Sequence, residues 1–116
     1  MAEAPKHVQF FGDQERSFAL TPELVLELER ITGSGIGGLC QRLFRSDFKL
    51  ADISATIRLG LIGGGASPED AAGLVAAYAQ SRPLAETFPL AVAILETLWF
   101  GAAKTQVEDD QDEVKA

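Results

Sequence analysis

The chain has 116 residues, a formal net charge of −7 and one cysteine, Cys40. This length fits one domain, and the acidic balance argues against a nucleic-acid partner because phosphates attract clustered Lys and Arg. A lone cysteine excludes an internal disulfide and a cysteine-based metal site, so a reducing cytoplasm is the simplest compartment. The N-terminus lacks a signal-peptide pattern, and no apolar run approaches the roughly 18 residues of a membrane span, so no membrane insertion is expected.

A change of composition near Lys104 divides the chain into two parts. Residues 1–103 hold nearly all the large apolar side chains and are expected to form a single domain. Residues 104–116 carry five acids against two lysines. Nothing there could offset the entropy of ordering, so this segment is predicted to be an acidic, disordered tail. A domain this small is modestly stable alone, and a homo-oligomer would add buried surface.

The first predicted element is a β-hairpin. Residues 7–11 and 14–20 are rich in aromatic and apolar side chains and flank Gly12-Asp13, where a leading glycine suits a two-residue type II′ turn. Strand alternation puts Phe10 on one face with Val8. Because an isolated hairpin is marginally stable, one of its sides should cover the helices.

Two helices are predicted next by their caps and by apolar spacing near 3.6 residues. Thr21-Pro22-Glu23 supplies an N-cap and a first-turn proline, and Gly33 ends the first helix. Ser34 is expected to cap a second, short helix. Glu29 and Arg42 fall outside the apolar stripes, so both are expected to face away from the core.

The third predicted helix starts around Ser46-Asp47 or at Asp52, with both aspartates interpreted as caps. Leu50 is expected to point inward with the apolar positions that follow it. The helix should end at Gly63-Gly64-Gly65, which is predicted to act as a flexible joint.

Ser67-Pro68-Glu69-Asp70 marks the start of a fourth helix, with a serine cap, a proline and first-turn acids. Pro83 opens the last helical region, Pro89 is expected to kink or restart it, and Gly101 closes it. These elements predict an α+β, mostly α fold in which an N-terminal β-hairpin packs on a bundle of about four to five short helices.

The motifs that resemble catalytic or cofactor sites have structural explanations. Residues 33–38 satisfy the letters of G-x-G-x-x-G, but they leave a helix instead of a strand, which favours a helix-to-helix turn. His7 is the single histidine and has no neighbouring ligand types. The pair Glu69-Asp70 is explained by its helix start. No catalytic, metal or cofactor site is therefore expected, and the chain is not expected to be an enzyme.

One segment resembles a known family. Residues 55–65 read Ala-Thr-Ile-Arg-Leu-Gly-Leu-Ile-Gly-Gly-Gly and are followed by Pro-Glu-Asp-Ala-Ala at 68–72. This string is similar to the gene transfer agent family of phage tail assembly chaperones. The hairpin ending in Phe18-Ala-Leu20 and the closing apolar helix at 90–101 agree with that family in order, so the resemblance covers about residues 8–102.

The resemblance implies a non-catalytic tail assembly chaperone in the bacterial host cytoplasm, with the tape measure protein and the tail tube protein as partners. The alternative is a structural head-to-tail connector or minor tail subunit, which shares the size, the acidity and the lack of active-site residues. Adjacent aromatic residues point about 100° apart on a helix, so one of the final pair should be exposed. The hypothesised partner-binding residues are Ile57, Leu61, Ile62, Leu95, Trp99 and Phe100.

Overall fold

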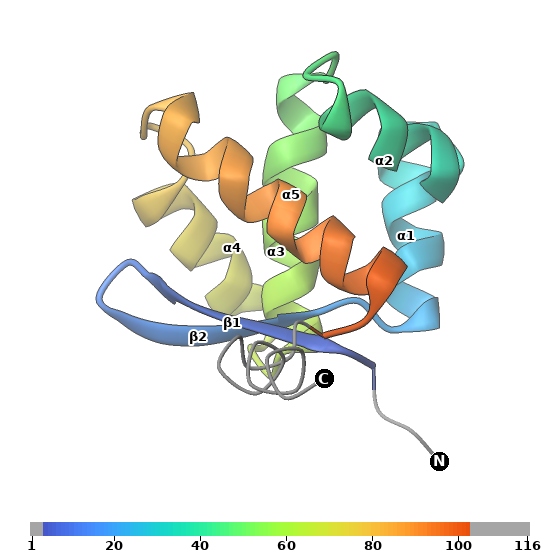
Figure 1. Cartoon of the computed structure of the whole chain (residues 1–116). Helices are drawn as coiled ribbons and strands as arrows, with labels where there is room; N and C mark the ends of the chain where they lie inside the picture. The colour runs from blue at the N-terminus through green and yellow to red at the C-terminus, as the bar shows by residue number, and fades with distance from the viewer. Residues whose placement is uncertain (1–3, 103–116) are drawn as a thin grey trace, which may run out of the picture.

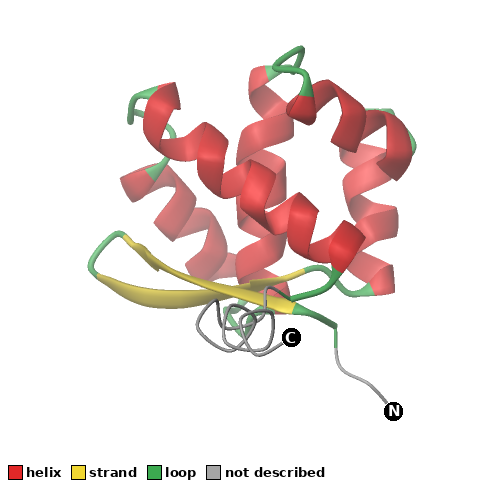
Figure 2. Cartoon of the chain, viewed as in Figure 1, coloured by secondary structure: helices red, strands yellow, loops and turns green. Residues whose placement is uncertain are grey.

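The computed structural model describes residues 4–102, so the predicted acidic tail at 104–116 lies outside the described residues. Two strands and five helices follow one another there, and the predicted α+β, mostly α fold is confirmed (Figure 2). Their order is β1 (Lys6–Phe11), β2 (Gln14–Ala19), α1 (Pro22–Thr32), α2 (Ile36–Phe44), α3 (Leu50–Gly63), α4 (Pro68–Tyr78) and α5 (Leu84–Phe100).

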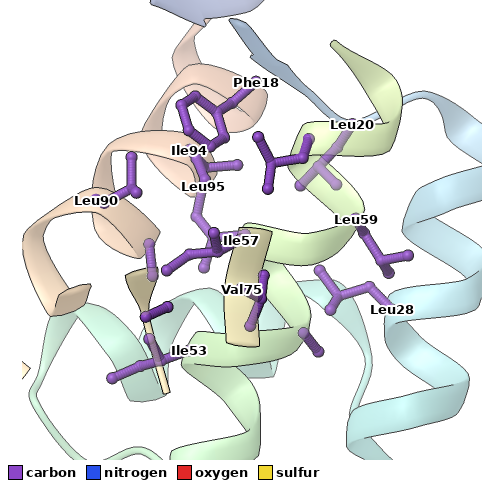
Figure 3. Close-up of a cluster of buried hydrophobic side chains, with 14 of the residues drawn as sticks. Phe18, Leu20, Leu28, Ile53, Ile57, Leu59, Val75, Leu90, Ile94 and Leu95 are labelled. Atoms are coloured by element: carbon purple, nitrogen blue, oxygen red, sulfur yellow. The ribbon is translucent and has the colours of Figure 1, made fainter. Parts of the chain in front are cut away.

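The helix α3 lies at the centre of the molecule. It packs against β2, α1, α4 and α5, while the hairpin lies across one end of the helices (Figure 1). Side chains from all these elements converge on it, including Phe18, Leu28 and Ile94 (Figure 3). With neighbours on several sides, α3 is buried around most of its circumference instead of along one stripe.

The hairpin has the predicted turn and covers the helices with one face. Gly12 has a φ of 76°, and Ser46 is the single non-glycine residue with positive φ in the described range, so Asp13 keeps a negative φ, as a type II′ turn requires. The inner face places Phe11 and Phe18 edge to face, with ring centroids 5.9 Å apart. The outer face leaves Phe10 exposed, together with its face neighbour Val8.

Two of the three glycines predicted to act as a flexible joint, Gly63 and Gly64, instead form a tight contact at the end of α3. A Cβ added to Gly63 would lie 1.9 Å from the carbonyl oxygen of Ala19, and one added to Gly64 would lie 1.8 Å from that of Ser17. Both oxygens belong to the edge of β2 that does not pair with β1. The absence of side chains therefore lets the end of α3 rest directly on the strand backbone.

Two predicted caps are confirmed. The Thr21 hydroxyl accepts a hydrogen bond from the Leu24 amide at 3.3 Å, and the Ser67 hydroxyl accepts one from the Asp70 amide at 3.1 Å. Each satisfies one of the amide groups that a helix start leaves unpaired. The starts of α1 and α4 are therefore set by residues close in sequence.

The start of α2 differs from the prediction. Gly35 is its N-cap, and the Glu29 carboxylate in α1 accepts a hydrogen bond from the Ile36 amide at 2.8 Å. The Ser34 hydroxyl instead accepts from the Arg42 guanidinium. The expectation that Ser34 caps α2 and that Glu29 points to water is wrong, because a carboxylate from the preceding helix reaches the positive end of α2.

Two further expectations, for Leu50 and for Pro89, are corrected. Leu50 is 67% exposed, because it is the first residue of α3 and projects beyond the helices that surround the rest of α3. Pro89 does not restart the last helix, since α5 continues through it. Pro89 cannot donate to the carbonyl of Ala85, which is an exposed residue.

Candidate interaction surfaces

The hypothesised partner-binding residues fall into two groups in the structure. Ile57 and Leu95 are fully buried and Leu61 is 2% exposed, and the close-up of the core shows Ile57 and Leu95 pointing into it (Figure 3). These three side chains are used inside the domain, so they leave no surface for a partner. The apolar spacing had identified a buried face of α3 and a buried face of α5.

The other three residues are accessible to different degrees. Ile62 is partly buried against the core, whereas Trp99 is 57% and Phe100 is 76% exposed. Both aromatic residues belong to the last turn of α5, where Leu98 still packs against the core. We call Trp99 and Phe100 together the α5 tip. It is an exposed aromatic pair on a rigid element, which is a typical anchor for protein contacts.

A broad apolar groove lies at the same end of the molecule as the α5 tip. Its volume is about 1020 Å³, and Leu98 lines it together with Val25 and Leu26 of α1. Leu26 is 65% exposed. Clustered apolar side chains of this kind mark a surface that is suited to protein contact.

A smaller groove lies at the other end of α5, between the start of α3 and the start of α5. Its volume is about 310 Å³. Leu50 and Leu84, which are 67% and 47% exposed, line it, and Ile53 and Ala79 are buried beneath. Arg82 also lines it. We call this hollow the α3–α5 groove.

Arg82, just before α5, forms an ion pair with Glu86 in the first turn of that helix. Its Nε and Nη2 atoms each donate to the Glu86 carboxylate at 2.9 Å. These hydrogen bonds lower the pKa of the Glu86 carboxyl below its usual value, so the pair stays charged near neutral pH. The guanidinium therefore lies beside the α3–α5 groove as part of an exposed ion pair.

An ion pair with a buried carboxylate joins α2 to the start of α3. Arg42 of α2 donates to the carboxylate of Asp52 at 2.8 Å, and Asp52 is fully buried. The same carboxylate oxygen accepts from the Lys49 amide at 2.8 Å. The Lys49 ammonium in turn donates to the carbonyl oxygen of Thr32 at 3.1 Å. Asp52 does act near its helix start as expected, but the sequence did not reveal Arg42 as its partner.

Three features were considered as possible catalytic, metal or nucleotide sites, namely Cys40, His7 and the glycine-rich segment at 33–38. Burial raises the pKa of the Cys40 thiol to about 11, so it is not a reactive thiolate near neutral pH. His7 lies in β1, where its Nε2 is 2.8 Å from the Gln9 side-chain oxygen. Within residues 4–102, no group of three or more His, Cys, Asp or Glu side chains could hold a metal ion. In the glycine-rich segment 33–38, residues 33–35 form the predicted turn from α1 into α2, and Gly37 and Gly38 lie in the first turn of α2.

A search of the described helices finds none long and apolar enough to cross a membrane.

Comparison with known proteins gives one match. A family model described as "Phage tail tube protein, GTA-gp10" matches residues 4–101. No curated protein and no solved structure matches the chain. The matching family is that of a tube protein, which is a structural component of the tail, so the expectation of a tail assembly chaperone is wrong. The structural alternative agrees with the match.

Proposed function

The chain belongs to the phage tail family described as tail tube protein, GTA-gp10, and from that premise we propose that it is a non-catalytic structural subunit of the tail of a phage or gene transfer agent. The observation that carries this proposal is the extent of the match, which runs through both strands and all five described helices. The proposal therefore concerns the whole described domain and not one motif.

The surface of the domain supports a role in assembly. Eight large hydrophobic residues are exposed among residues 4–102, and they occupy the outer face of the hairpin, the α5 tip and the rims of both grooves as well as α2. A subunit that stays in a particle buries such surfaces against its neighbours. We propose further tube subunits as the partners.

Two other expectations belong to the same proposal. A contact with the tape measure protein is compatible with a place in the tail, and copurification of the two untagged chains would test it. Assembly in the cytoplasm of the bacterial host is proposed for the same reason, because tail subunits must meet before the particle is complete.

Immunogold electron microscopy of purified particles tests the proposal. A short peptide tag is added after Ala116, and particles are labelled with an antibody against the tag. A tube subunit predicts gold along the length of the tail. Gold confined to the head-to-tail junction, or no gold on particles from cells that contain the tagged chain, would contradict a place in the tube.

A further inference from the structure

The two ends of α5 carry different surface features, an exposed aromatic pair and a groove. The helix has 17 residues, so a rise of about 1.5 Å per residue separates its ends by roughly 25 Å. Its last turn presents the α5 tip, and its first residue, Leu84, lines the α3–α5 groove. Figure 1 shows the helix crossing the molecule from beside the end of α4 to beside α1. The α5 tip and the α3–α5 groove therefore lie at opposite ends of α5.

The α3–α5 groove has the size and chemistry to bind an aromatic side chain. Its volume of about 310 Å³ lies near the lower end of the range of roughly 300–1,000 Å³ found for binding pockets. Leu50 and Leu84 offer apolar walls that are now open to water. The Arg82 guanidinium, which lines the groove, can stack on the face of an indole ring. A tryptophan side chain offers an apolar ring for these walls and a ring face for the guanidinium.

We propose that the α5 tip of one copy docks in the α3–α5 groove of a second copy, which makes a head-to-tail contact. This inference rests on the proposed function, because a tail tube subunit meets further copies of itself. The tip cannot reach the groove of its own chain, since a rigid helix holds them apart. Trp99 supplies the anchor, and Phe100 covers the rim of the contact.

The contact is heterologous, because it joins two different surfaces of the same chain. Each copy in a pair keeps one free tip and one free groove, so the contact repeats into a closed ring or a continuous filament. An isologous contact would instead stop at a dimer. A head-to-tail contact is therefore the kind that fits a subunit of a tube.

The outer face of the hairpin is the main competing surface. Val8 and Phe10 are exposed there, and no strand pairs with the outer edge of β1 in the described part of the chain. Two copies that met through the same surface of the hairpin about a twofold axis would form an isologous contact. The test below separates it from the head-to-tail contact.

Two variants each remove one half of the proposed contact. Trp99→Ala with Phe100→Ala removes the tip and leaves the groove, and Leu84→Asp places a charge in the groove and leaves the tip. Aspartate is favourable near the positive start of a helix, so the second variant should keep its fold. Phe10→Ser is the matched control, since Phe10 is also an exposed aromatic residue but lies on the outer face of the hairpin.

Sedimentation velocity of the purified full chain measures the association. The wild-type chain and Phe10→Ser should associate as the concentration rises, and each contact variant alone should bind at least about tenfold more weakly. A mixture of the two contact variants should form a one-to-one dimer and nothing larger, because one retains a groove and the other retains a tip.

Three results would overturn the inference. They are a wild-type chain that stays monomeric at every concentration, a loss of association in Phe10→Ser alone, and a mixture of folded contact variants that remains monomeric. Circular dichroism of each variant establishes that it is folded. These measurements use protein in solution, so a negative result leaves the labelling of particles as a separate test of the proposed function.

Discussion

Substitution of Gly64 by alanine tests the direct contact between α3 and β2. Gly64 has a φ of −83°, which alanine adopts without strain, and removal of a glycine there would by itself stabilise the fold by up to about 1 kcal/mol. The added Cβ, however, would lie 1.8 Å from the Ser17 carbonyl oxygen. A carbon–oxygen contact needs about 3.3 Å, so helix and strand must separate by roughly 1.5 Å.

Overpacking of this kind costs about 1–3 kcal/mol, and a strand backbone yields less than a flexible side chain. We therefore expect Gly64→Ala to lower the free energy of unfolding by about 2 kcal/mol and the melting temperature by roughly 10 °C. Urea denaturation followed by far-ultraviolet circular dichroism measures the first quantity, and a thermal scan measures the second.

Gly73→Ala in α4 is the matched control. Gly73 is exposed within the helix, and a Cβ there would have no neighbour within 4 Å. This variant should be more stable than the wild type by about 0.5–1 kcal/mol. The reasoning is refuted if Gly64→Ala is as stable as the wild type, or if the two substitutions change stability in the same direction.

Three further predictions concern Asp52, Cys40 and Trp99. Asp52→Ala should lower the free energy of unfolding by about 3 kcal/mol in urea, because it leaves the Arg42 guanidinium without its buried partner; a loss below about 1 kcal/mol would show that the pair does not hold the helices together. Burial raises the pKa of the Cys40 thiol from 9.0 to about 11, so the folded state holds this proton more tightly than the unfolded state. Stability should therefore fall as pH rises from 9.0 to about 11, and Cys40→Ala should lose that part of the decline; an unchanged pH dependence in the variant would contradict it. Trp99 is the sole tryptophan, so its fluorescence in dilute solution should be at long wavelength and readily quenched by acrylamide; emission typical of a buried indole would place it in the core.

Local sequence signals predicted the hairpin turn and two helix starts. Gly12-Asp13 set the turn, and Thr21 and Ser67 capped α1 and α4, because each of these features needs partners only three residues away or fewer. The fold class followed from the same signals together with apolar spacing. Such interactions can be read from one stretch of sequence because the chain brings their partners together by itself.

Contacts between distant segments explain what the sequence did not predict. The Glu29 carboxylate caps the following helix, and the Asp52 carboxylate pairs with Arg42 from another helix. Gly63 and Gly64 were interpreted as a joint because their tight neighbour, the backbone of β2, is more than forty residues earlier in the chain. None of these partners is visible in a local pattern.

Among the candidate interaction surfaces, only the α5 tip was predicted from the sequence. Apolar spacing predicted that Ile57 and Leu61 point inward, and both are buried, as is Leu95; these three side chains were also hypothesised to bind a partner, but α3 and α5 pack them inside the domain. A pattern shows that a face is apolar, and tertiary packing decides whether that face meets the core or a partner. The exposed Trp99 was suspected because two adjacent aromatic residues cannot share one narrow stripe.

The claim that this chain is a structural part of the tail is tested most directly by its copy number in mature particles. Mass spectrometry with isotope-labelled peptide standards, applied to particles purified by density gradient, measures that number. A structural subunit predicts several copies per particle, in the same ratio to the other tail proteins in every preparation. Detection of the chain in producing cells but not in mature particles would contradict the account.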